Sequence, residues 1–391
     1  MKRVYLDNSA TTPTRPEVIE AMLPYFNEYF GNPSSIHSFG REVSKGVTEA
    51  RENVAKLLGA EEPAEIIFTS GGTESDNLAI IGTALAKKDK GNHIITTKIE
   101  HHAVLHTCEY LEKYFGCEVT YLPVDEYGMV DPKDVRKAIT DKTILITIMF
   151  ANNEIGTIQP VAEIGKIAKE HGVLFHTDAV QAVGSIPINV QEMNIDMLSL
   201  SGHKFNGPKG VGALYVRRGI KLVPHMHGGA QERKRRASTH NTPGIIGLGK
   251  AAELALKELD EKREKLTRLR DKLITGIEEK IPEVILNGHR TQRLPNNVNF
   301  SFKYIEGESL LLNLDLKGIA ASSGSACTSG SLDPSHVLLA IGRSHEVAHG
   351  SLRMTLGIYN TEEEINYVLE VLPEIVEKLR QMSPLYKTTN V

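Results

Sequence analysis

The sequence has few cysteines, no long apolar run and no large excess of charge of one sign. Its three cysteines, Cys108, Cys117 and Cys327, contain no Cys-x-x-Cys pair, so we expect neither a disulfide framework nor a zinc site. The first residues lack the apolar segment of a secretory signal, and no stretch approaches the roughly 18 apolar residues of a membrane span. A formal net charge of −4 gives no reason to expect nucleic-acid binding. These absences indicate a soluble, cytoplasmic protein without membrane or nucleic-acid partners.

The chain of 391 residues is too long for one ordinary domain and suits two. Short runs rich in Ile and Val alternate with longer helical patterns, which is typical of α/β architecture. Most of these runs are apolar on successive residues, as in strands buried on both faces, so we predict a mainly parallel sheet covered by helices. Helices are expected at 75–87 and 161–171. The seven predicted strands are 66–69, 93–97, 119–123, 144–150, 174–177, 197–200 and 211–216.

The pattern changes after about residue 244. We predict one long amphipathic helix over 248–280, then a polar strand over 296–302 and a closing helix over 362–382. These elements indicate a second, smaller α+β domain, which the N-terminal segment joins. The predicted division is a large domain over 15–255 and a small domain formed by 1–14 with 256–391.

Three strand-end or loop motifs carry candidate chemistry. Lys204 follows a buried strand, at the sheet edge where open α/β sheets place ligands, and a desolvated lysine there becomes nucleophilic toward carbonyls. The loop 69–74 joins a strand to a helix, and its glycines and helix N-terminus suit a phosphate; the alternative is an ordinary start capped by Thr73 or Ser75. Asp178 ends another strand and could pair with a protonated pyridine nitrogen or act as an N-cap.

Together, these motifs resemble the aspartate-aminotransferase fold type, fold type I, of pyridoxal-phosphate enzymes. Further motifs narrow the resemblance to cysteine desulfurases of the NifS/IscS type, over nearly the whole chain and in the family's order. They lie at 6–13, 31–37, 100–101, 152–156 and 322–329.

The resemblance implies a role for each matching residue. Lys204 would bind the pyridoxal 5'-phosphate covalently and later move the α-proton, while His101 would stack on its ring as a candidate acid or base. Asn153 and Arg353 would hold the substrate carboxylate, and Cys327 would accept sulfur from L-cysteine as a persulfide. The residues implied in cofactor binding are Gly72, Thr73, His101, Asn153, Asp178 for the ring nitrogen, Gln181 for the ring oxygen, Ser201, His203, Lys204, and Thr239 across a dimer interface.

The sequence surroundings of Arg353 and Cys327 agree with the roles that the resemblance implies for these two residues. An arginine in a strand-like run such as 350–356 is usually an edge charge, but facing a cleft Arg353 would suit a bidentate carboxylate clamp. Cys327 is flanked by small residues, which is typical of an accessible loop, whereas Cys108 lies in a helical pattern and Cys117 begins a strand. Without the lysine and aspartate motifs, Cys327 would be interpreted as an incidental exposed thiol.

The sequence departs from the family's pattern at one position, and alternative functions stay open. The family's Arg-x-Gly-Thr is Arg236-Ala237-Ser238-Thr239 here, so the loop angles and the reach of Thr239 depend on Ser238. The adjacent His101 and His102 would point apart, and we expect no metal site. The rivals are a selenocysteine lyase or aminotransferase of the same fold, and a catalytically silent binding protein. The implied partners are L-cysteine, a second copy of the chain and an iron–sulfur cluster scaffold protein.

Overall fold

The computed structural model describes residues 3–323 and 334–389. Its largest sheet has seven strands in the order β2-β8-β7-β6-β5-β3-β4. Each corresponds to a predicted strand, and the predicted α/β class with a mainly parallel seven-stranded sheet is confirmed. Strand β8 runs antiparallel to both of its neighbours. The strands are β2 (Ile66–Thr69), β3 (His93–Thr97), β4 (Glu118–Leu122), β5 (Thr143–Thr147), β6 (Leu174–Asp178), β7 (Met197–Ser201) and β8 (Gly212–Val216).

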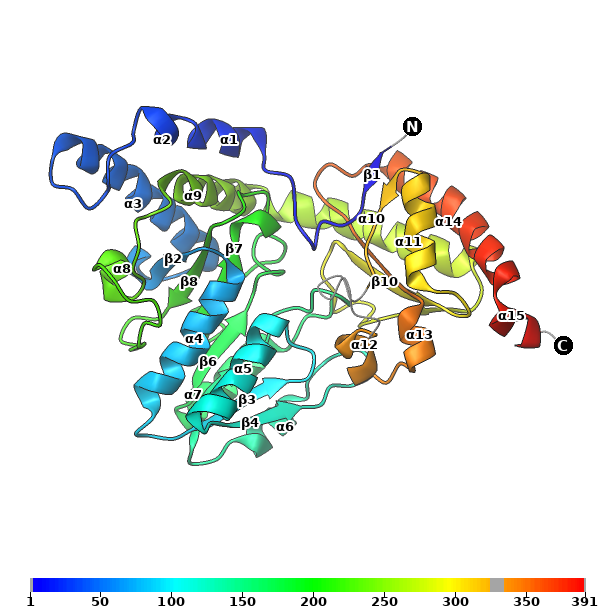
Figure 1. The fold of residues 1–391 in the computed structure, drawn as a ribbon, viewed down its shortest axis with the longest axis horizontal. Coiled ribbons are helices and arrows are strands. Elements are labelled where there is room, and N and C mark those ends of the chain that lie inside the picture. Colours follow the sequence, from blue (N-terminus) through cyan, green and yellow to red (C-terminus); the bar gives the residue numbers. More distant parts are fainter. Residues whose placement is uncertain (1–2, 324–333, 390–391) are drawn as a thin grey trace.

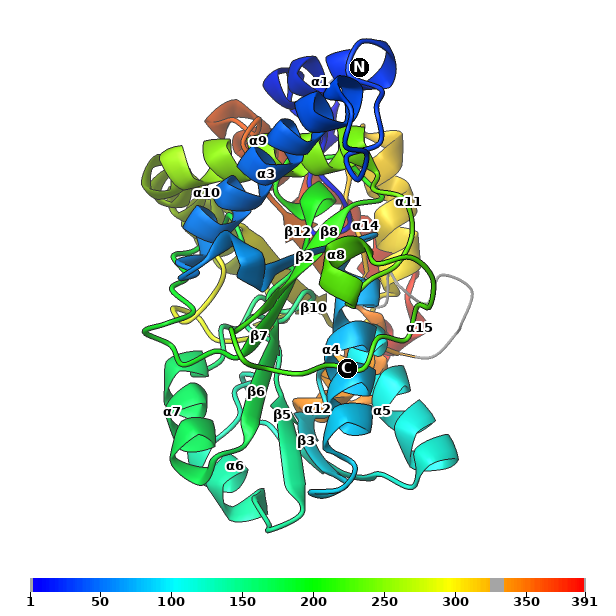
Figure 2. The same ribbon diagram turned by 90° about the vertical axis from the view of Figure 1, so that its left-hand side faces the viewer.

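Helices cover both faces of this sheet (Figures 1 and 2). Neighbouring strand residues enter different apolar clusters: Ile94 packs with α4 (Gly72–Lys87) and α5 (His102–Phe115), whereas Ile95 packs on the other face. This is why the strands are apolar on successive residues. The helices of that other face are α1 (Pro16–Met22), α3 (Ser38–Leu58), α6 (Pro132–Ala138), α7 (Val161–His171) and α9 (Thr242–Lys257).

A second group of elements has its own apolar cluster. Strand β10 (Asn297–Phe302) lies between β12 (Ser351–Thr355) and β9 (Val284–Leu286) in an antiparallel sheet. The polar strand predicted at 296–302 is therefore confirmed, and all residues of the observed strand are buried. Strand β1 (Val4–Tyr5) pairs with β11 (Ile319–Ala320). The helices packed here are α10 (Leu259–Lys280), α11 (Gly307–Leu316) and α14 (Glu362–Met382).

The prediction of one helix over 248–280 is wrong. Helix α9 ends at Lys257 and α10 begins at Leu259, because Glu258 leaves helical geometry with φ −106° and ψ 7°. The two helices bury their apolar residues in different clusters, α9 with the seven-stranded sheet and α10 with the three-stranded one. A single straight helix cannot direct its apolar stripe to both. Glu258 also accepts a hydrogen bond from Arg15 at 2.5 Å.

The remaining helices are short. None of the helices in the described part of the chain is long and apolar enough to cross a membrane. They are α2 (Pro24–Asn27), η1 (Pro63–Glu65), η2 (Gly202–Lys204), α8 (Gln231–Lys234), α12 (His336–Ala340), α13 (His345–His349) and α15 (Pro384–Thr389).

Candidate active site

A cavity of about 260 Å³ lies at the carboxyl ends of β6 and β7, where the sequence predicts the site. Of the twelve predicted site residues, Thr239 is exposed and does not line it, and Cys327 lies outside the described residues. The other ten all line this cavity: Gly72, Thr73, His101, Asn153, Asp178, Gln181, Ser201, His203, Lys204 and Arg353.

The two central side chains come from paired strands. Asp178 is the last residue of β6 and is paired in register with Ser199 of β7, while Lys204 is the last residue of η2, the short helix that follows β7. The Lys204 Nζ donates to the carbonyl oxygens of Ser9 and Ala10, at 2.5 and 2.9 Å. Burial raises the pKa of Asp178, while His101 and Lys204 act in the opposite direction. An acid and a primary amine therefore share one desolvated cavity.

The phosphate-loop motif forms an open helix N-terminus. Gly71 is the N-cap of α4, with φ 156° and no side-chain cap, so neither Thr73 nor Ser75 caps the helix. A Cβ on Gly72 would lie 2.6 Å from the Val180 side chain, so any larger residue would have to displace Val180. The free N–H groups of the first turn can therefore receive an anion. His203 lines the same cavity, and burial together with Lys204 and Lys209 lowers its pKa to about 4.

His101 is held at the cavity wall by its neighbours in the chain. It is the N-cap of α5, and its Nδ1 accepts from the Ala103 N–H at 3.1 Å. The preceding Glu100 is fully buried and accepts from the Met149 N–H at 3.0 Å and from the Thr97 hydroxyl at 2.6 Å. Burial raises the pKa of Glu100 to about 8. These bonds tie the turn carrying His101 to β3 and to the segment after β5.

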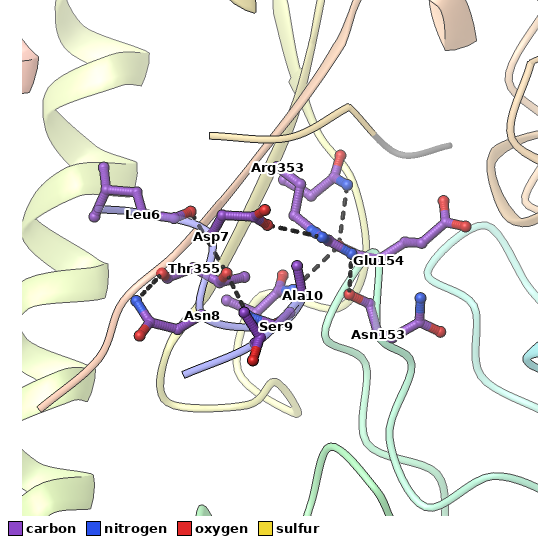
Figure 3. A network of polar contacts seen from close by, with 12 residues as sticks. Leu6, Asp7, Asn8, Ser9, Ala10, Asn153, Glu154, Arg353 and Thr355 are labelled. Carbon is purple, nitrogen blue, oxygen red and sulfur yellow. Dashed lines mark hydrogen bonds and ion pairs between the residues drawn. The ribbon is translucent and has the colours of Figure 1, made fainter. Parts of the chain in front are cut away.

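Arg353 comes from the second sheet and is buried, with 3% of its side chain exposed. Its guanidinium donates to Asp7 Oδ1 at 3.0 Å and to the Asn153 carbonyl at 3.1 Å (Figure 3). The Nε atom has no hydrogen-bond partner among the described residues. The alternative of an exposed edge charge is wrong, although β12 is an edge strand. The arrangement leaves the guanidinium able to bind a further anion.

Three buried polar atoms of residues that line the cavity indicate whether pyridoxal phosphate fits there. Within the described ranges, the Asp76 Oδ1, Ser9 Oγ and Arg353 Nε are buried without a hydrogen-bond partner. Buried polar atoms are normally satisfied, so these three indicate a polar ligand. The open helix N-terminus, the Asp178 carboxyl and the Lys204 amine match a phosphate, a pyridine nitrogen and a carbonyl. The residues present therefore fit the cofactor.

Sequence reasoning missed several residues of the site. Asp7 lies in the motif 6–13, but only the fold shows that it contacts Arg353. Asp76 lies four residues after Gly72 on α4, hence on the same helix face, and this spacing could have identified it. Ser9 and Ala10 act through backbone carbonyls, which no residue pattern reveals.

The basic segment near Thr239 has an unusual backbone. Glu232, Arg233 and Lys234 all have positive φ, between 45° and 65°, and Ser238 has φ 96°. A serine therefore takes the left-handed geometry at the position where the resembling family has glycine. The Glu232 carboxylate is buried and accepts from both terminal nitrogens of Arg51, at 2.7 and 2.8 Å. These contacts fix the segment against α3, and the Phe68 N–H of β2 donates to the same carboxylate at 3.0 Å.

Comparisons with known proteins agree with this geometry. The sequence matches the Aminotransferase class-V family over residues 4–368. The chain therefore belongs to this family of pyridoxal-phosphate-dependent enzymes. It is 66% identical to Cysteine desulfurase IscS of Methanosarcina thermophila over 384 residues, covering 98% of this chain and 94% of that relative. Over nearly its whole length, the chain is thus similar to a member of this family that is named a cysteine desulfurase.

Two solved structures show the same fold. A NifS-like protein superimposes with a TM-score of 0.91 and 41% identity, covering 97% of this chain and all of the other. SspA in complex with cysteine gives a TM-score of 0.81 and 40% identity, over 92% of this chain and all of that one. The resemblance inferred from the motifs is confirmed, and so is the fold type.

Proposed function

We propose that this protein is a cysteine desulfurase that transfers sulfur from L-cysteine to its own Cys327. The observation that carries the proposal is the meeting of Asp178, Lys204 and Arg353 in one buried cavity. Bound pyridoxal phosphate supplies an electrophilic carbonyl and a ring that withdraws electrons from an amino acid. The chain supplies an anion for the ring nitrogen, an amine for the carbonyl and a cation for the substrate carboxylate.

Lys204 and Arg353 would act on different parts of the substrate. The Arg353 Nε and its terminal nitrogens would bind the cysteine carboxylate and orient the α-carbon. Lys204 Nζ would take the α-proton and later return a proton to the product. His101, which lines the same cavity, would be a second acid or base beside Lys204.

The proposed sulfur transfer takes place between two thiols, that of the substrate cysteine and that of Cys327. The Cys327 thiolate attacks the substrate sulfur, a new S–S bond forms, and the C–S bond of cysteine breaks with its electron pair remaining on carbon. That carbon gains a proton, so L-cysteine and the Cys327 thiol give L-alanine and the Cys327 persulfide.

The other two thiols are poor acceptors. Cys108 is buried in α5, and burial raises the pKa of its thiol. Cys117 is half-buried, and burial raises the pKa of its thiol as well. A thiolate is the attacking species, so a raised pKa disfavours both residues. This elimination supports Cys327.

The test compares Cys327→Ser with a matched control, Cys117→Ser. Each purified protein is incubated with L-cysteine, and alanine is measured together with persulfide by mass spectrometry of the intact chain. We expect both products to vanish for Cys327→Ser and to persist for Cys117→Ser. Normal alanine formation by Cys327→Ser would remove Cys327 from the reaction.

We also propose that the protein is a homodimer. Large apolar side chains are exposed on and after α1 and α2, which lie along one edge of the molecule (Figure 1). A patch of this kind is typical of a protein–protein interface. Sedimentation should show a dimer, and a fully active monomer would contradict it. The exposed residues are Ile19, Leu23, Phe26, Tyr29, Phe30, Ile36 and Phe39.

The remaining proposals concern organisation and partners. We propose a large domain over 15–255 and a small domain over 1–14 with 256–391, which the two separate apolar clusters support. We propose a cytoplasmic location and an iron–sulfur cluster scaffold protein as the sulfur acceptor. Transfer of labelled sulfur from the persulfide to such a scaffold in solution tests the last point.

A further inference from the structure

The cavity contains a second buried carboxyl group besides Asp178. Asp76 lies on the first turns of α4, is 1% exposed and lines the cavity. Its Oδ1 has no hydrogen-bond partner among the described residues. The only side-chain nitrogen of a His, Lys or Arg recorded within 4 Å of it, in the same ranges, belongs to His176, at 3.6 Å.

His176 does not compensate a charge on Asp76. It is fully buried, and burial lowers its pKa to about 3, so the imidazole is neutral at neutral pH. Its Nδ1 is 2.8 Å from the Thr147 hydroxyl and its Nε2 is 3.0 Å from the Ser199 hydroxyl. Both ring nitrogens are therefore engaged with hydroxyl groups at hydrogen-bonding distance, and His176 supplies no positive charge to Asp76.

The surroundings of Asp178 differ. Its Oδ1 accepts a hydrogen bond from the Val180 N–H at 2.9 Å, and His101 and Lys204 favour its charged form. For Asp76, burial and the nearby carboxyls of Asp178 and Glu100 favour the protonated form, and only the Ser199 hydroxyl opposes them. Two carboxylates in one desolvated cavity cannot both ionise at low cost.

We propose that Asp76 is a positioning residue that holds a proton inside the cavity and so leaves Asp178 as the ionised carboxylate. The inference rests on the proposed function, in which Asp178 pairs with the ring nitrogen of the cofactor. A neutral Asp76 leaves Asp178 free of a second negative charge nearby. The titratable side chains that face Asp76 are Asp178, Glu100 and His176.

The direct test is infrared spectroscopy of the apoprotein labelled with ¹³C-aspartate at pH 7. The wild type should show the C=O stretch of a protonated carboxylic acid, and Asp76→Asn should lose it. Ser199→Ala should shift the band, because the acid loses its hydroxyl neighbour, and this variant serves if Asp76→Asn does not fold. A wild-type spectrum without the band, or a band that neither variant changes, would overturn the proposal.

Cofactor affinity separates this inference from the proposed function. Asp76→Asn replaces a neutral acid by a neutral amide, so the dissociation constant for pyridoxal phosphate should change by less than about threefold. The pH dependence of the visible absorption should also stay as in the wild type. If Asp76 were ionised, removing its charge would change the affinity by about tenfold or more, and that result would contradict the proposal.

Asp178→Asn is the matched control. It should weaken cofactor binding by more than tenfold, which corresponds to a change of about one unit or more in the pKa of the ring nitrogen. The Asp76 infrared band should remain, because burial, the larger cause of its protonation, is unchanged. An unchanged affinity in Asp178→Asn would refute the assigned role of Asp178, whereas loss of the band in the wild type would refute only that of Asp76.

Discussion

Two regions meet at the cavity, and they hold their side chains by different means. On the side of the seven-stranded sheet, Asp178 and Lys204 are placed by the backbone ladder between β6 and β7. On the side of the three-stranded sheet, the ladder between β12 and β10 places the Arg353 backbone, and the guanidinium is held by contacts to Asp7 and to the Asn153 carbonyl. Both regions therefore rest on backbone ladders, and the second depends in addition on an ion pair between Arg353 and Asp7, a residue far away in the sequence. Substitutions should therefore act on chemistry in the first region and on substrate binding in the second.

Removing the amine should have the largest effect. Lys204→Ala should abolish alanine formation, while the melting temperature of the apoprotein stays within a few degrees, because Lys204 is half-buried and lies outside the apolar clusters. Alanine release and circular dichroism melting are the measurements. Lys98→Ala, an exposed lysine after β3, is the control and should keep full activity. Wild-type turnover by Lys204→Ala would exclude Lys204 from the reaction.

Arg353→Lys should have the next largest effect. One ammonium cannot contact Asp7, the Asn153 carbonyl and a substrate carboxylate in the geometry of a planar guanidinium. A charge-assisted hydrogen bond contributes roughly 1.5–3 kcal/mol, so kcat/KM for cysteine should fall about tenfold to a hundredfold. Steady-state kinetics measure this, and Arg343→Lys, which affects a contact to Asn287 instead, should leave kcat/KM unchanged. An equal loss in both variants would indicate a general destabilisation.

Asp7→Asn should have a smaller effect of the same kind. The amide oxygen can still accept from Arg353, but the charge is lost, which weakens the contact by roughly 1 kcal/mol. We expect KM for cysteine to rise about fivefold with kcat little changed, since Arg353 becomes less well oriented. A fall in kcat with constant KM would instead show that Asp7 affects the chemical steps and not substrate binding.

The smallest effect is expected at Glu154, where the two regions meet, and it concerns the pH dependence of stability. The Glu154 carboxyl is buried and accepts from Ser335, and its backbone carbonyl accepts from Asn297 and Asn299 at 3.1 and 3.0 Å. Burial raises its pKa to about 7, so its contribution to stability is fully present below pH ~4.5 and is lost as the pH rises through 7.

Glu154→Gln should therefore lose less stability than the wild type between pH 5 and pH 8, with a difference of a few degrees in melting temperature, on the order of 2–4 °C. Thermal melts at both pH values test this. The exposed Glu163→Gln should follow the wild type. A parallel decline in Glu154→Gln would show that Glu154 titrates normally.

The sequence predicts one of the two regions better than the other. The strands of the seven-stranded sheet are recognisable because both of their faces are buried, and a residue after such a strand must lie at the sheet edge. The location of Lys204 and Asp178 follows from that rule, whereas their roles came from the combined motifs. The contact between Asp7 and Arg353 joins residues far apart in the chain, so no local pattern shows it. The break at Glu258 was missed for the same reason, because it depends on which cluster each helix contacts.

The residues between Val4 and Thr12 connect β11, Arg353, Lys204 and His203 through pairing or hydrogen bonds. Val4 is made early on the ribosome, but its partner Ile319 follows 315 residues later, since 319 − 4 = 315. At about 5–20 residues per second, the early segment waits on the order of 15 to 60 s for that partner. The nascent chain can thus complete its large sheet, whose last strand ends at Val216, long before Ile319 and Arg353 are available to the N-terminal segment. Newly made protein would gain its fold first and its competence only near the end of translation.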